Sequence, residues 1–142
     1  MNTDTLSYPV DQIAAERSGL TAAGVKALAS ELRWPEALML KAIGLPTSSW
    51  TRKKGRDSRV DGAPGFAALT LQGLLERARE VVEATVAPDD AADFDVGQWL
   101  GEWLQTPMAA LQGKRPVDML DVPAGQAVVF RLLGSLESGA YQ

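Results

Sequence analysis

Apolar residues return every three or four positions along most of the chain, which is the spacing of an α-helix that buries one face. The longest such stretch runs from Pro64 to Val86 and carries a broad stripe of leucine, alanine and valine. No stretch shows the clear alternation of apolar and polar residues that indicates a β-strand. The pattern predicts an all-α fold, with helices near residues 10–17, 21–32, 35–43, 47–54, 64–86, 96–105 and 123–137.

Residues with capping and helix-breaking preferences place several of the helix ends. Thr21 precedes an apolar stripe and is predicted to cap the helix that follows it. Gly44 is predicted to end one helix in a tight turn, and a hydroxyl of Thr47, Ser48 or Ser49 is expected to cap the next helix. The two helices on either side of Gly44 therefore have the proportions of a helix-turn-helix pair.

The composition is that of a globular chain that lacks the commonest catalytic side chains. Apolar residues make up 46% of the 142 residues and charged residues 23%, which is ordinary for such a chain. Because the sequence has neither cysteine nor histidine, it excludes thiol nucleophiles, disulfides and histidine general bases. No membrane-spanning run and no secretion signal is visible, so we expect a cytoplasmic protein. We also expect it to bind no cofactor or metal, because the commonest metal-ligating side chains are missing.

The net charge of −4 is unevenly distributed along the chain. Residues 1–74 hold 9 basic and 7 acidic side chains, whereas residues 75–142 hold 5 basic and 11 acidic ones. The basic excess is concentrated in the short segment from Arg52 to Arg59. Such an asymmetry favours two surfaces with two kinds of partner.

The second helix of the helix-turn-helix pair carries much of this basic cluster. In such a pair the second helix enters the major groove of DNA, where its first residues reach base edges and nearby cations bind phosphates. The alternative is a solvated basic loop beside a structural helix pair. Under the DNA-binding hypothesis a dimer would match two half-sites, and the contacting residues are Thr47, Ser48, Ser49, Arg52, Lys53, Lys54, Arg56 and Arg59.

The segment from Trp99 onward carries the most specific pattern in the chain. A tryptophan–leucine helix is followed by proline, leucine and glycine at fixed spacings, a short apolar stretch, a further helix and a final Gly-x-Tyr. The matching positions are Trp103, Leu104, Pro107, Leu111, Gly113, Pro116, Leu120, Gly125, Val129, Leu133, Gly139 and Tyr141. This pattern resembles the toxin-binding domain of the Xre/MbcA/ParS antitoxins. Upstream, residues 40–54 and the long helix after them resemble the Xre-like domain of that family, from which Gly62-Ala63-Pro64 departs.

The resemblance implies a partner and a mechanism. Antitoxins of this kind belong to type II toxin–antitoxin systems and pair with a RES-domain toxin, which consumes NAD as an NAD-degrading or ADP-ribosylating enzyme. They neutralise the toxin by covering its active-site cleft, and many repress their own operon through the helix-turn-helix. NAD would belong to the toxin, so no cofactor is implied for this chain. The implied all-α architecture has a helix-turn-helix region over 1–62, a connecting helix over 63–90 and a toxin-binding domain over 91–142.

The expected toxin contacts lie in one turn and in the residues after the last helix. Tyr141 offers a large contact area at low entropic cost, which suits an interface anchor, although most chain ends are simply frayed. Lys114 and Arg115 lie in a turn that meets either the partner or solvent. The predicted toxin-binding residues are Lys114, Arg115, Gly139, Ala140, Tyr141 and Gln142.

Other patterns have ordinary structural explanations. Trp99 and Trp103 are four residues apart and are expected to pack in the core. The aspartates between residues 89 and 95 lack the glutamate that an EF-hand needs, so we expect them to stop and cap helices. Two competing functions are a stand-alone helix-turn-helix regulator without a toxin, and a small carboxylate enzyme. The enzyme would use a pair such as Glu102 and Asp118, which no spacing supports.

Overall fold

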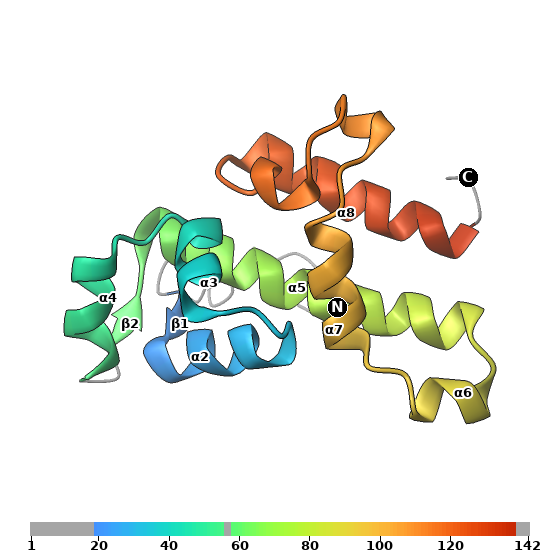
Figure 1. Cartoon of the computed structure of the whole chain (residues 1–142), viewed down its shortest axis with the longest axis horizontal. Helices are drawn as coiled ribbons and strands as arrows, with labels where there is room; N and C mark the ends of the chain where they lie inside the picture. The colour runs from blue at the N-terminus through green and yellow to red at the C-terminus, as the bar shows by residue number, and fades with distance from the viewer. Residues whose placement is uncertain (1–18, 56–57, 139–142) are drawn as a thin grey trace, which may run out of the picture.

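The structure is a computed structural model that describes residues 19–55 and 58–138 (Figure 1). It confirms the all-α class, while the predicted helix over residues 10–17 lies outside the described residues. The helices are α2 (Ala22–Glu31), α3 (Glu36–Ile43), α4 (Thr47–Lys54), α5 (Gly62–Thr85), α6 (Pro88–Ala92), α7 (Val96–Leu104) and α8 (Pro123–Ser138), with 3₁₀ turns η2 (Ala109–Leu111) and η3 (Pro116–Met119). Within these ranges no helix combines the length and the apolar composition that crossing a membrane requires.

Two short features depart from the prediction, and the first is the helix α6, which lies where no helix was predicted. The second is a pair of strands. The strand β1 (Leu20–Thr21) pairs antiparallel with β2 (Arg59–Val60). Strands of two residues are too short to show a period of two, so the pattern along the chain missed them. Gly19 and Gly65 permit this close packing, because a Cβ on either would stand within 2.2 Å of the Val60 carbonyl oxygen. The pair ties the start of α2 to the start of α5.

Two of the three predicted helix ends are confirmed. Thr21 Oγ1 accepts a hydrogen bond from the backbone N–H of Gly24 at 3.0 Å, and Gly44 follows α3 in the left-handed conformation with a φ of 75°. The prediction that a hydroxyl side chain caps α4 is wrong, because Pro46 occupies the cap position and Thr47 is already helical. The fixed φ of proline, here −62°, suits the extended backbone that precedes a helix.

The long helix α5 forms the spine of the molecule, and α8 lies along it in the same direction (Figure 1). Near the start of both helices, the Thr70 hydroxyl donates to Gln126 Oε1 at 3.1 Å. The amide nitrogen of the same Gln126 donates to the Leu120 carbonyl at 2.9 Å, so this buried polar pair is hydrogen-bonded. Farther along, the Arg77 guanidinium pairs with the Glu137 carboxylate at 2.6 Å. Residue numbers increase together on the two helices, which are therefore parallel.

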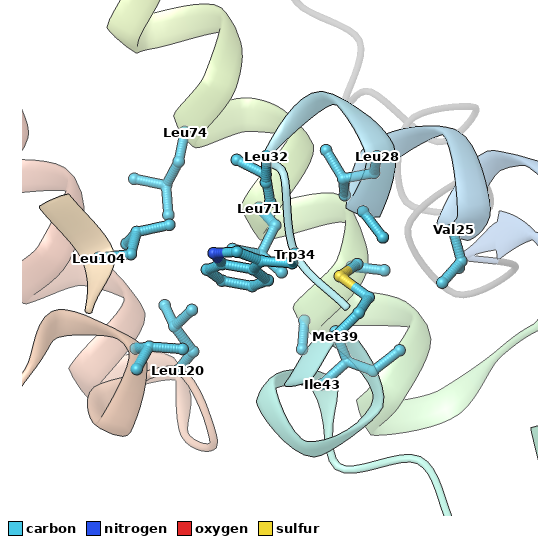
Figure 2. Close-up of a cluster of buried hydrophobic side chains, with 14 of the residues drawn as sticks. Val25, Leu28, Leu32, Trp34, Met39, Ile43, Leu71, Leu74, Leu104 and Leu120 are labelled. Carbon is cyan, nitrogen blue, oxygen red and sulfur yellow. The ribbon is translucent and has the colours of Figure 1, made fainter. Parts of the chain in front are cut away.

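The buried apolar side chains form a cluster that is continuous from α2 to α8. In the view of Figure 2, the Trp34 ring lies at the centre of this cluster, with Leu104 and Leu120 on one side and Met39 on the other. The indole N–H of Trp34 donates to the carbonyl of Gly101 in α7 at 3.2 Å. The helices before α5 therefore share one core with the helices after it.

Two glycines let α7 cross the end of α2 at very short range. A Cβ on Gly97 would stand 2.0 Å from the Glu31 carbonyl oxygen, and a Cβ on Gly101 would stand 2.1 Å from that of Leu32. Both glycines are buried, and their spacing of four residues places them on the same face of the helix. A stripe of α7 without side chains therefore rests directly on the backbone of α2.

Candidate DNA-binding and partner-binding surfaces

The helices α3 and α4, which are separated by a turn at Gly44, occupy the segment predicted to be a helix-turn-helix pair and lie at one end of the molecule (Figure 1). Trp50 anchors α4, because its side chain is only 2% exposed and its indole N–H donates to the carboxylate of Glu36 at the start of α3. The ammonium of Lys54 lies 3.5 Å from the same carboxylate. The buried ring of Trp50 and the contacts to Glu36 therefore fix the orientation of α4, and its opposite side faces solvent.

The predicted DNA-contacting residues divide into exposed and half-buried side chains. Ser49 and Lys53 are half-buried. Arg56 lies outside the described residues. The exposed members of the set are Thr47, Ser48, Arg52, Lys54 and Arg59. Thr51, which the sequence prediction did not include, is also exposed and donates through its hydroxyl to the Thr47 carbonyl at 3.0 Å. Its position one turn after Thr47 was the signal that places it on the same side of α4.

Two of these basic side chains bind the chain's own backbone. Lys53 Nζ donates to the carbonyl of Arg59 at 2.9 Å, and the Arg59 guanidinium donates to the carbonyl of Gly19 at 2.8 Å. Both bonds hold the segment around β2 against its neighbours. Arg52 makes no hydrogen bond or ion pair with the part of the chain that the structure describes. Arg52 is therefore the cation of α4 that is most available to a partner.

The segment between α7 and η3 folds into a hydrogen-bonded loop that projects from the molecule (Figure 1). The backbone N–H of Met108 donates to the Lys114 carbonyl at 3.0 Å, and that of Gly113 donates to the Met108 carbonyl at 2.8 Å. Gln112 and Gly113 turn the chain with positive φ values of 58° and 83°, while Leu111 and Met108 are buried at the base. The loop therefore presents the exposed side chain of Lys114 in an ordered backbone.

Arg115, the other predicted toxin contact of this turn, is bound within the chain. Its guanidinium donates to both carboxylate oxygens of Asp118, at 3.2 and 2.9 Å. These hydrogen bonds hold the pKa of Asp118 below its usual value, so this carboxylate is poorly suited to act as a general acid at neutral pH. Glu102 accepts a hydrogen bond from Gln98 on α7 instead. No described contact joins Glu102 to Asp118, and the structure lends the carboxylate-enzyme hypothesis no support.

The tryptophan pair and one of the aspartates singled out from the sequence have structural roles, whereas Asp89 and Asp90 lie within the first turn of α6 and do not cap a helix as expected. The rings of Trp99 and Trp103 stack with centroids 6.2 Å apart and pack, half-buried, against the core. Asp95 caps α7 by accepting the backbone N–H of Gln98 at 3.0 Å, and this bond lowers its pKa. Asp93 is exposed in the turn before it. The predicted toxin contacts Gly139, Ala140, Tyr141 and Gln142 lie outside the described residues.

The described residues form a small helical protein. A pair of helices with exposed basic side chains on the second helix precedes a further helical part with a projecting loop. The family model of the antitoxin Xre/MbcA/ParS C-terminal toxin-binding domain matches residues 86–139, which include α6, α7, η2, η3 and α8.

Two relatives agree with the family match. A protein named Prs ADP-ribosylating antitoxin, from Sphingobium sp. (strain YBL2), is 32% identical over 133 residues, which cover 94% of this chain and 82% of that protein. A protein named antitoxin Xre, from Yersinia enterocolitica serotype O:8 / biotype 1B (strain NCTC 13174 / 8081), is 29% identical over 107 residues, 75% of this chain and 65% of that protein. The chain belongs to the Xre/MbcA/ParS family of antitoxins, as its sequence pattern predicted.

Proposed function

We propose that this antitoxin neutralises a RES-domain toxin that degrades NAD or uses it for ADP-ribosylation. The observation that carries the proposal is the toxin-binding family match over residues 86–139. The relative named Prs ADP-ribosylating antitoxin supports the class of toxin. The chain contributes contact surface and no chemistry, so NAD belongs to the toxin and the pair acts in the cytoplasm, where NAD is available. Neutralisation then consists of excluding the substrate from the toxin's active site.

The proposed toxin contacts are those predicted from the sequence, and the exposure of each side chain indicates which of them is most able to reach the toxin. Lys114 is exposed on the projecting loop and is the stronger candidate. Arg115 already donates hydrogen bonds to Asp118, so we expect it to hold the shape of the loop more than to contact the toxin. Residues 139–142 follow α8 directly and include Tyr141 as the anchor. The proposed domain organisation is a helix-turn-helix region over 1–62, a connecting helix over 63–90 and a toxin-binding domain over 91–142.

We further propose that the protein represses its own operon through α4. The exposed side of α4 carries Arg52 with the hydroxyls of Thr47, Ser48 and Thr51, a combination suited to phosphates and base edges. Two copies would pair on an operator with two half-sites. The second candidate function, a stand-alone regulator, keeps this DNA-binding role and omits the toxin. The two functions differ in whether residues 86–139 have a protein partner.

Deleting residues 140–142 should weaken inhibition of the toxin by about tenfold or more, because it removes an aromatic anchor from the interface. The thermal unfolding midpoint should change little, since the deleted residues follow the last helix. The measurement is a titration of toxin-catalysed NAD consumption with the full-length and the truncated antitoxin. Thr51→Ala, an exposed substitution on α4, is the control and should inhibit like the unmodified protein. Equal inhibition by the truncated protein would exclude residues 140–142 from the mechanism.

A further inference from the structure

A cavity of about 610 Å³ lies between α2, the start of α3 and α4. Its floor is apolar, and the floor side chains Val25, Trp34 and Met39 belong to the core cluster shown in Figure 2. Its rim is polar and exposed. Sites for small molecules have volumes in this range and combine apolar walls with a few polar groups. The cavity therefore has the size and the lining of a ligand site.

The walls of the cavity are held in place by the packing of the helices. Helical spacing puts the four residues of the α2 wall in one stripe, and they are Val25, Lys26, Ala29 and Ser30. On the α4 side the wall includes Trp50, whose ring is 2% exposed. Because the floor is part of the shared core, the cavity is already formed and a ligand need not order it.

The rim carries one positive charge that has no partner. It holds the cations Lys26 and Lys54 and the anion Glu36. The Glu36 carboxylate accepts the indole N–H of Trp50 and lies 3.5 Å from the Lys54 ammonium, so these two charges compensate each other. Lys26 is exposed and makes no hydrogen bond or ion pair with residues 19–55 or 58–138. The cavity thus has a local positive excess in a chain of net charge −4.

We propose that this cavity binds a small aromatic acid, with its rings on the apolar floor and its anionic group paired with Lys26. A charge-assisted hydrogen bond to an ammonium is stronger than one between neutral groups. A neutral aromatic compound would leave Lys26 without a partner, and an aromatic amine would be repelled by it. The acid is the class of ligand that complements both the floor and the rim.

Operator DNA is the competing anion for Lys26. Its phosphates pair with exposed cations, but they have no apolar surface to place on the floor beside Trp34 and Met39. DNA would therefore use the rim of the cavity and leave its interior empty. An aromatic acid uses both.

Binding in the cavity would act on α4, because Trp50, Lys54 and Gly55 contribute to its wall. The acid adds a negative charge beside the helix proposed to contact DNA, and this charge repels the phosphate backbone. We expect the bound acid to lower the affinity of the protein for operator DNA. This effect rests on the proposed repressor function, whereas binding of the acid does not.

The test compares two fluorescent dyes with the same aromatic body, anilinonaphthalene sulfonate and the neutral phenylnaphthylamine. The sulfonate stands in for the anionic group of the acid. Titration of the pure full-length protein should show that the sulfonate dye binds about tenfold more tightly. Lys26→Met should abolish this preference, and Lys26→Arg should retain it. Lys41→Met is the matched control, because Lys41 is an exposed lysine of α3 that does not line this cavity.

Equal affinity for the two dyes would overturn the proposal, and so would a preference that persists in Lys26→Met. If the unmodified protein binds neither dye and Lys26→Met loses operator affinity, Lys26 belongs to the DNA contact instead. The effect on α4 is measured with operator DNA carrying a red-emitting label, in the presence of saturating sulfonate dye. Operator affinity should fall about tenfold, and unchanged affinity would contradict the effect. A protein that binds no DNA even without dye would remove the repressor function, while the dye preference would still decide on the cavity.

Discussion

Replacing Gly101 by alanine is expected to lower the free energy of unfolding by about 3 kcal/mol, a large fraction of the stability of a small domain. The added Cβ would stand 2.1 Å from the Leu32 carbonyl oxygen and 3.1 Å from the Trp34 ring nitrogen. The first atom belongs to the backbone and the second to a buried side chain, so neither moves aside easily. The strain would push α7 away from α2 and break the hydrogen bond from Trp34 to Gly101.

Gly134→Ala is the matched control for this prediction. Gly134 also lies inside a helix, but a Cβ there would have the flexible guanidinium of Arg77 as its nearest neighbour, at 3.5 Å. Alanine favours a helix over glycine by up to about 1 kcal/mol, so this variant should be as stable as the unmodified protein or slightly more stable. Urea denaturation of both variants measures the difference. Equal stability of the two would show that α7 does not rest on α2 as described.

Arg52→Ala should weaken binding to the DNA upstream of the antitoxin gene by about tenfold and lower the slope of affinity against salt by about one. Arg52 is the exposed cation of α4 that makes no hydrogen bond or ion pair within the described residues, so its loss should remove a proposed DNA contact without disturbing the fold. Toxin binding should be unchanged. The double variant Arg52→Ala with Lys53→Ala should lose more affinity, partly because Lys53 also holds the Arg59 carbonyl at 2.9 Å.

Lys41→Ala provides the control for charge alone. Lys41 is exposed on α3 and carries the same charge as Arg52, but it lies outside the proposed DNA-contacting helix. Its removal should change affinity much less than the loss of Arg52 does. The measurement is fluorescence anisotropy with labelled operator DNA at several salt concentrations. Unchanged affinity in Arg52→Ala would remove α4 as the DNA-reading helix.

Local sequence signals predicted most of the helices because each depends on neighbours a few residues away. The long helix was predicted from Pro64 to Val86 and is observed over Gly62–Thr85, and the last was predicted over 123–137 and is observed over Pro123–Ser138. The cap of α4 was predicted wrongly, since a hydroxyl and a proline are both compatible with a helix start and only the observed backbone decides between them. The helical period therefore determines helix positions better than helix ends.

Features that depend on distant residues could not be predicted in the same way. The glycine stripe of α7 has meaning only because the end of α2 lies against it, and the tie from Arg59 to Gly19 joins residues 40 positions apart. For the candidate site, spacing correctly placed α4 and the projecting loop. It did not distinguish exposed Arg52 from half-buried Lys53, nor Lys114 from Arg115, whose partner is Asp118. Those distinctions require tertiary contacts.

The most direct test of the antitoxin function is co-purification of this protein with the product of the adjacent reading frame, which we expect to be the RES-domain toxin, followed by an NAD-consumption assay on that product. We predict a stable complex in which NAD consumption is suppressed, with activity returning when the antitoxin is removed. Absence of a complex, or a complex in which NAD consumption continues unchanged, would contradict the account and favour the stand-alone regulator.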